Sequence, residues 1–405
     1  MPTCTFVVDA GLTWTVSGVV LSVHGDWRYR YKFGKIRTNH EGSFDLDASG
    51  ITVRLSVTVG WDKTTGHPTI VSAGCSSSVG NLSIRLQGVA SWFYDFFVRF
   101  VEKPIGNDLE TSICDAARRA IDKNAREELA TLGISTAVGR NWLLDYRLVA
   151  PPRYAAGELE TYHKGEFFYN TDLSEAPFYA PRFPPPPAVD RMLSIVISEY
   201  VANTGLYVLF NHGFLTYELT KTNLADTDKT FLDTECSGTC FGRLIPNLRR
   251  KYPAASVEME MTISQAPTLE IHPSGIFGHF LMTVVCYARS TADNIPHYIG
   301  TISLAVKVAL DVVLDGTAVK AQVVSLSLTS PITIDDSTIG TLSSRSLNNA
   351  FDLLKTFIIK KLNDFTDKGV QLLDLEGVEF VDSKLELGER CIYVSTDVRY
   401  QPKPL

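Results

Sequence analysis

The sequence lacks the local motifs by which several enzyme classes are recognised. It contains no glycine pattern of a dinucleotide- or ATP-binding loop, no His-Glu-x-x-His and no nucleophile elbow. The eight histidines are scattered, and no second Cys or His pair accompanies Cys236 and Cys240 to complete a zinc site. We therefore expect no enzymatic activity, no cofactor and no metal. A Cys/His hydrolase remains an alternative that no local motif supports.

Long apolar runs are also missing. No stretch reaches the roughly 18 uncharged apolar residues of a membrane-spanning helix. Residues 1–10 contain no Lys or Arg and no apolar run of signal-peptide length. Taken alone, these absences predict a soluble chain that is not secreted.

Positive charge is in the minority, because 38 Lys and Arg face 45 Asp and Glu, which gives a net charge of −7. This balance argues against a protein whose whole surface binds nucleic acid. Hydrophobic residues make up 45% of the chain, enough to exclude disorder throughout. A length of 405 residues predicts two or three domains.

Cysteines are few, and their odd number leaves at least one unpaired within the chain. The seven are Cys4, Cys75, Cys114, Cys236, Cys240, Cys286 and Cys391. One Asn-Leu-Ser triplet, beginning at Asn81, is compatible with glycosylation of an exported protein.

Alternation of apolar and polar residues dominates the sequence. It occurs over residues 53–59, 82–87 and 257–263, and it predicts antiparallel strands with one buried and one wet face. The longest run spans residues 302–314 and is followed by Asp315-Gly316, a strong hairpin signal. Such a long strand indicates an elongated, strongly twisted sheet or barrel.

Two segments change to the helical period. Residues 89–101 carry an aromatic stripe, Pro104 is expected to kink or end that helix, and helical spacing resumes at about residue 108. Residues 346–364 form the other amphipathic segment. The order of strands, helix and closing strands thus occurs twice. We predict two β-plus-helix domains, residues 1–175 and 191–405, joined by a stiff proline-rich linker at 176–190.

A basic stretch between Asp26 and Arg37 is the best local candidate for a binding site. Its cations are Arg28, Arg30, Lys32, Lys35 and Arg37. They alternate with aromatic residues, so a strand would carry cations on one face and rings on the other. That pattern suits phosphorylated lipids, a membrane surface or single-stranded nucleic acid. The alternation alone, however, favours an ordinary half-buried strand.

The aromatic stripe of the first helix has a similar ambiguity. Core packing is the usual role of such a stripe, and a lipid cavity or a membrane surface is the alternative. The residues concerned are Trp92, Phe93, Phe96, Phe97 and Phe100.

Several stretches together resemble the family of bactericidal/permeability-increasing protein, lipopolysaccharide-binding protein and the plasma lipid-transfer proteins. The resemblance runs from about Ala10 to the C-terminus, and the order and spacing of the stretches are specific. They are Gly25–Tyr29, Gly42–Leu46, Gly66–Ile70, Ala90–Tyr94, Asp145–Pro152, Lys164–Tyr169, Arg191–Leu193 and Asn203-Thr204.

The resemblance implies an α+β fold, in which two elongated barrels of twisted antiparallel sheet each wrap a long helix, in a boomerang with a central sheet. Each barrel would hold an apolar tunnel for acyl chains. The basic stretch would become a barrel-tip hairpin that binds the phosphorylated head of lipopolysaccharide. The family disulfide maps onto Cys75 and Cys114, and Cys236–Cys240 would be a second, local bridge.

The resemblance further implies a secreted, monomeric and non-enzymatic lipid-binding protein of antibacterial defence. Its partners would be lipopolysaccharide or phospholipid and the bacterial outer-membrane surface, and it would not bind nucleic acid. The alternatives are transfer of phospholipid or neutral lipid between particles and, less favoured, hydrolysis of lipid esters. Family members carry a strand and a long helix before the stretch matched by Gly11. We therefore expect a truncated first barrel without that strand and helix, and Cys4 outside the fold.

Overall fold

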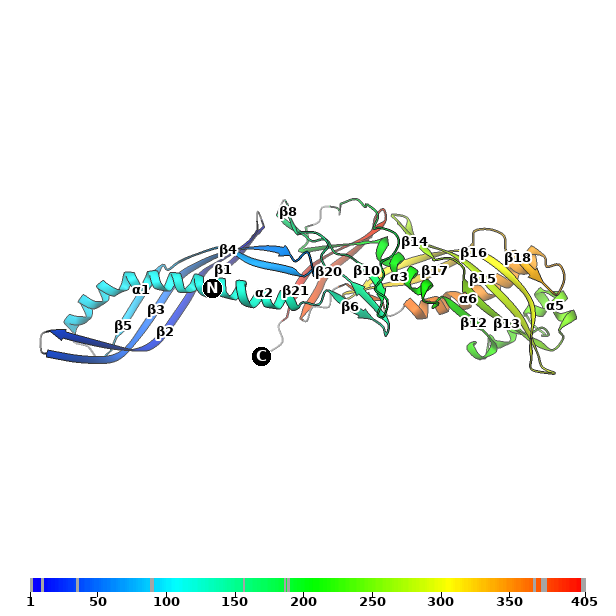
Figure 1. Ribbon diagram of the computed structural model, residues 1–405, viewed down its shortest axis with the longest axis horizontal. Coiled ribbons are helices and arrows are strands. Elements are labelled where there is room, and N and C mark those ends of the chain that lie inside the picture. The colour runs from blue at the N-terminus through cyan, green and yellow to red at the C-terminus, as the bar shows by residue number, and fades with distance from the viewer. Residues whose placement is uncertain are drawn as a thin grey trace. The chain divides into compact units, whose positions relative to one another are not determined.

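The computed structural model describes residues 3–8, 11–33, 36–87, 91–155, 157–185, 187, 190–366, 369–372 and 377–401. Its contacts divide the chain into two units (Figure 1). Unit 1 comprises residues 1–136 and 145–164, and unit 2 comprises residues 137–144 and 165–405. The domain limits predicted at residues 175 and 191 lie slightly later in the chain and stay a prediction.

Unit 1 is built on an antiparallel sheet in the order β1-β2-β3-β4, with β5 also paired to β3. The strands are β1 (Thr3–Val8), β2 (Leu12–Phe33), β3 (Ile36–Trp61), β4 (Pro68–Ser78) and β5 (Asn81–Leu86). Strands β2 and β3 have 22 and 26 residues, so the expected elongated sheet is present. The expectation that Cys4 lies outside the fold is wrong, because β1 pairs with β2 and places Cys4 opposite Val16.

A single long helix, α1 (Ser91–Arg119), lies along β3, β4 and β5 in Figure 1. Of the two outcomes expected at Pro104, an end of the helix is wrong, because α1 continues through the proline, and a kink stays a prediction. Apolar side chains that follow the proline at helical spacing, Ile105, Leu109 and Ile113, pack on the sheet core around Leu46. This packing stabilises α1 and so compensates for the backbone hydrogen bond that Pro104 cannot donate.

Shorter elements complete the first 170 residues. They are η1 (Ala120–Ala125), α2 (Arg126–Thr131), β6 (Ser135–Val138), β7 (Trp142–Asp145), β8 (Arg153–Ala155), β9 (Glu158–Glu160) and β10 (Glu166–Tyr169). Strands β8 and β9 pair with each other, and β10, β7 and β6 form a small sheet in that order.

Unit 2 contains an eight-stranded sheet and a three-stranded sheet. The larger has the order β12-β13-β15-β16-β17-β19, with β14 paired to β15 and β18 to β16, and the smaller has the order β11-β21-β20. The strands are β11 (Leu193–Ser198), β12 (Thr216–Leu219), β13 (Ala255–Ile263), β14 (Thr268–His272), β15 (Gly275–Ser290), β16 (Pro296–Asp315), β17 (Ala318–Leu328), β18 (Thr333–Ser337), β19 (Val370–Gln371), β20 (Val378–Leu387) and β21 (Cys391–Tyr400).

The hairpin predicted at Asp315-Gly316 is confirmed, because Asp315 pairs with Ala318 and Gly316 adopts a positive φ of 61°. The helical segments of unit 2 are α3 (Glu199–Asn211), η2 (Lys221–Asn223), η3 (Lys229–Leu232), α4 (Phe241–Leu244), α5 (Pro246–Lys251) and α6 (Ser344–Thr366).

Helix α6 supplies the apolar centre of unit 2. Its residues Leu347, Phe351 and Leu354 share one face, and they pack with inward-facing side chains of the large sheet such as Met259 and Val284. The predicted amphipathic helix at 346–364 is therefore confirmed, with two more residues at each end.

A buried carboxylate joins the two sheets of unit 2. Glu199, the first residue of α3, is only 6% exposed. Its Oε1 accepts a hydrogen bond from Arg390 Nε at 2.8 Å, and its Oε2 accepts one from the Ile271 backbone N–H at 3.2 Å. The Glu199 carboxylate therefore accepts hydrogen bonds both from strand β14 and from the turn between β20 and β21, and so connects the two sheets.

We predict that Glu199→Ala lowers the free energy of unfolding by about 2 kcal/mol, because the buried Ile271 N–H loses its acceptor. Denaturant unfolding of the purified protein measures the change. Glu389→Ala is the matched control, since that neighbouring carboxylate is 54% exposed and its removal should cost little. Equal losses in the two variants would contradict the role of Glu199.

Candidate functional site

The β2–β3 hairpin places the predicted cations together. Its register sets Arg28 opposite Glu41, Arg30 opposite Asn39 and Lys32 opposite Arg37. Because strand side chains alternate between faces, these residues share one face of the sheet. The side chains of Arg28 and Arg30 are exposed.

For three of the five predicted cations the structure describes no side chain. Lys32 and Arg37 are positioned by the strand register, and their side chains lie outside the described residues, as does the whole of Lys35.

Folding adds one carboxylate that the sequence prediction missed. Glu41 accepts hydrogen bonds from Arg28 Nε at 3.2 Å and from Arg28 Nη2 at 2.9 Å. The hairpin from Asp26 to Glu41 therefore carries five cations and two carboxylates, which gives it a net charge of +3. Phe33 pairs with Ile36 at the end of the hairpin, and counting five residues outward along each strand reaches Arg28 and Glu41. The position of the hairpin end is therefore the signal from which Glu41 could have been predicted as the partner of Arg28.

Farther from the hairpin end, the same face becomes acidic. His24 Nδ1 contacts Asp45 Oδ1 at 2.7 Å, and Asp47 accepts from Ser22 Oγ at 2.7 Å and from Arg85 Nη2 at 2.5 Å. The hydrogen bond to His24 lowers the pKa of Asp45, and those to Ser22 and Arg85 lower the pKa of Asp47. Both carboxylates thus stay charged, and positive charge is concentrated at the hairpin end.

The proposed tunnel-lining residues stand in the first ten residues of α1. Their side chains lie outside the described residues, so their role stays a prediction; they are Trp92, Phe93, Phe96, Phe97 and Phe100.

The described residues contain two disulfides. Cys75–Cys114 joins β4 to α1, and Cys236–Cys240 closes a short loop before α4. Among the described residues Cys286 and Cys391 are free thiols. Asn81 is exposed at the start of β5, where a glycan could be attached.

Unit 2 contains an apolar cavity of about 80 Å³ between the large sheet and α6. Its wall combines three of the chain's five methionines, Met259, Met261 and Met282, with side chains of α4, α5 and α6. The free thiol of Cys286 also lines the cavity, and burial raises its pKa to about 12, which keeps it neutral.

The part of the chain that the structure describes contains no group of three His, Cys, Asp or Glu residues placed to hold a metal ion. Within the same residues, no helix is long and apolar enough to span a membrane.

Comparison with known proteins identifies the family. The C-terminal domain of the LBP / BPI / CETP family matches residues 136–400, and the N-terminal domain of that family matches residues 2–125. The chain belongs to the LBP / BPI / CETP family. The resemblance inferred from the sequence stretches is thereby confirmed.

Similar proteins extend over nearly the whole chain. Bactericidal permeability-increasing protein of Sebastes schlegelii is 27% identical over 97% of this chain and 81% of its own length. The human lipopolysaccharide-binding protein is 24% identical over 97% of this chain and 80% of its own length.

A crystal structure of lipopolysaccharide binding protein matches with a TM-score of 0.61 at 20% identity, covering 99% of this chain and 85% of that one. The likeness confirms the predicted α+β fold class.

We predict that His24→Ala raises the pKa of Asp45 toward its ordinary value, because the hydrogen bond that favours the carboxylate is lost. NMR titration of the Asp45 carboxyl carbon measures the shift. Asp62 is the internal control, since backbone N–H groups of Thr64 and Thr65 lower its pKa without His24. An unchanged Asp45 pKa would show that His24 does not contact it in solution.

Proposed function

We propose that this protein is a non-enzymatic binder of bacterial lipopolysaccharide, and that the cationic end of the β2–β3 hairpin receives the phosphorylated head group. The observation that carries the proposal is the hairpin register, which gathers Arg28, Arg30, Lys32 and Arg37 on one face of the β2–β3 strand pair. Phosphates on an apolar anchor are the anions that such a surface suits. The names of the two relatives above support this choice of ligand.

The ion pair between Arg28 and Glu41 is compatible with the proposal. Both side chains are more than 60% exposed, so the pair contributes at most about 1 kcal/mol. A phosphate, which carries more charge than one carboxylate, can displace Glu41 from the guanidinium at little cost.

Acyl chains would be taken up by apolar tunnels, one in each unit. The cavity beneath α6 supports this role in unit 2, and the aromatic first turns of α1 are the candidate lining in unit 1. The same cavity favours a second candidate function, transfer of phospholipid or neutral lipid between particles. Native mass spectrometry separates the two, because co-purified phospholipid without lipopolysaccharide affinity would favour transfer.

We further propose an extracellular, monomeric protein that acts at the bacterial outer-membrane surface. The Cys75–Cys114 and Cys236–Cys240 disulfides support an oxidising compartment, and the exposed Asn81 supports a glycoprotein. With a net charge of −7, the chain suits capture at one cationic end better than general disruption of anionic membranes.

We predict that replacing Arg28, Arg30, Lys32, Lys35 and Arg37 together by Ala weakens lipopolysaccharide binding more than a hundredfold at low salt, because about 1 kcal/mol is lost for each charge. Isothermal titration at several salt concentrations measures the effect, and the affinity of the unmodified protein should fall as salt screens the charges. Arg85→Ala is the control, since that cation lies on the same face, away from the hairpin end. An unchanged affinity in the five-residue variant would refute the head-group role.

A substitution with the opposite expected effect is Glu41→Gln. It removes the partner of Arg28 and should increase lipopolysaccharide affinity about fivefold at low salt, which corresponds to about 1 kcal/mol for one unit of charge. Asp62→Asn changes the net charge equally at a turn outside the hairpin and should have little effect. Equal affinities for Glu41→Gln and the unmodified protein would count against binding at Arg28.

A further inference from the structure

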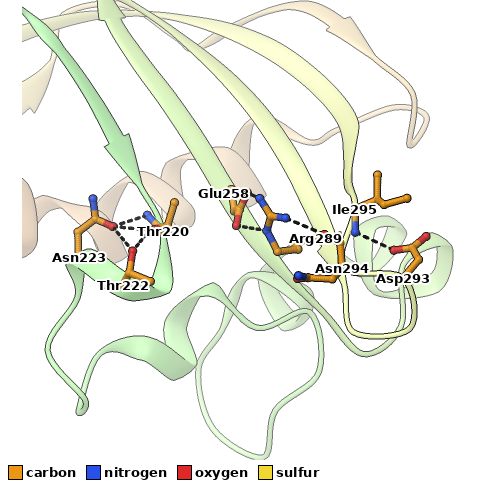
Figure 2. A network of polar contacts seen from close by, with 8 residues as sticks. All are labelled: Thr220, Thr222, Asn223, Glu258, Arg289, Asp293, Asn294 and Ile295. Carbon is orange, nitrogen blue, oxygen red and sulfur yellow. Dashed lines mark hydrogen bonds and ion pairs between the residues drawn. The ribbon is translucent and has the colours of Figure 1, made fainter.

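The Cys236–Cys240 disulfide closes a loop whose first end is fixed by hydrogen bonds to β13. The N–H and the Oγ1 hydroxyl of the buried Thr234 both donate to Ala255 O, at 2.9 and 3.0 Å. Strand β13 is in turn held to β15, because Arg289 donates to Glu258 through Nε at 2.5 Å and through Nη2 at 2.8 Å (Figure 2). The chain before the disulfide therefore has an anchor of its own.

The other end of the loop is fixed by packing. Phe241, the first residue of α4, is 4% exposed and belongs to the apolar core of unit 2. The Gly242 N–H donates to Asp233 O at 3.1 Å, and a Cβ atom on Gly242 would lie only 1.7 Å from Thr234 O. The segments on the two sides of the disulfide thus contact each other directly, so they stay together without the bond between the sulfur atoms.

The ring that this disulfide closes is short. Cys236 and Cys240 are 4 positions apart in the sequence, whereas Cys75 and Cys114 are 39 positions apart. In the chain-entropy model a disulfide stabilises the fold by restricting the unfolded chain, and the effect grows with the length of the ring. The short bridge therefore adds less stability than the bridge between β4 and α1.

The short bridge also lies at a partly exposed and positively charged place. Cys236 is half-buried and residues 237–239 are exposed, whereas Cys240 is completely buried. Between Cys236 and Val257 the sequence contains no Asp or Glu. The same stretch contains four exposed cations, which are Arg243, Arg249, Arg250 and Lys251. A thiolate is an anion, so this charge favours its approach to Cys236.

Arg243 brings one of these cations to the loop itself. Its Nη1 donates to Ser237 O at 2.8 Å and to Gly238 O at 3.0 Å, and both carbonyl groups lie between the two cysteines. Arg249 is offset by the Glu235 carboxylate at 3.0 Å, whereas these two acceptors of Arg243 are neutral. Positive charge beside a disulfide also stabilises the thiolate that forms when the bond between the sulfur atoms breaks.

We propose that Cys236–Cys240 is a site of reversible thiol–disulfide exchange with a small monothiol such as glutathione, and that unit 2 stays folded in both states. This inference does not rest on lipopolysaccharide binding at the β2–β3 hairpin. A partly exposed disulfide that other contacts make dispensable for the fold is the kind that exchanges readily.

The exchange takes two steps. In the first, the thiolate of one glutathione attacks Cys236 Sγ, the bond between the two cysteine sulfurs breaks, and Cys240 leaves as a thiolate that takes up a proton. In the second, another glutathione thiolate attacks the glutathione sulfur of the mixed disulfide, and Cys236 leaves and is protonated. Two thiols are thereby oxidised to one glutathione disulfide, and the protein disulfide is reduced to two thiols. The reverse sequence closes the bridge.

The test incubates the oxidised full chain in buffers with increasing ratios of reduced to oxidised glutathione. Iodoacetamide then blocks the free thiols, and mass spectrometry of tryptic peptides measures the open fraction of each disulfide. We expect Cys236–Cys240 to open at a ratio about tenfold or more below the ratio that opens Cys75–Cys114. The near-ultraviolet circular dichroism spectrum should stay native as the short bridge opens, and oxidised glutathione should close it again.

A second measurement removes the bridge. The variant with both Cys236→Ala and Cys240→Ala should keep nearly the melting temperature of the unmodified protein, because the two ends of the loop have other anchors. The matched control is the variant with Cys75→Ala and Cys114→Ala, which should melt at a clearly lower temperature or fail to fold, because it loses the longer ring.

Three results would overturn the proposal. They are equal resistance of the two disulfides to glutathione, loss of the native spectrum as Cys236–Cys240 opens, and a large fall in the melting temperature of the variant without the short bridge. Each of them would show that this disulfide is a structural cross-link of unit 2.

Discussion

The fixed register of the long antiparallel strands is the constraint on which the rest of the structure depends. A shift of β2 by one residue against β3 would move the cations of β2 to the face of the sheet on which α1 packs. Apolar side chains such as Leu21 and Leu46 pack in the core of unit 1 and prevent that shift. The burial of apolar residues on one face therefore fixes which charges meet on the other, including Arg28 with Glu41.

The same principle operates in unit 2 with a different outcome. Alternating side chains of β13, β15 and β16 point toward α6 and form a packed core that contains a small apolar cavity. Among the described residues, the hydrogen bonds that join the helix to the sheet are those between Asn363 and Val323.

Charge and apolar volume are distributed between the two units. The hairpin of unit 1 carries a local positive charge in a chain that is acidic overall, while the cavity of unit 2 is lined almost entirely by hydrocarbon. If both bind lipid as proposed, salt would weaken binding at the hairpin, because it screens exposed charges, and would leave binding in the apolar cavity unchanged. A lipid with a phosphorylated head and apolar chains offers chemistry that suits both.

The sequence by itself determined the strands, the two amphipathic helices and the hairpin at Asp315-Gly316, because alternation and helical spacing are local consequences of which face is buried. It also placed five cations near one turn. Only the tertiary structure decided that α1 continues through Pro104 and that Glu41 offsets Arg28. Each of these depends on contacts between residues distant in sequence, and local spacing carries no information about which distant side chain will occupy the neighbouring position.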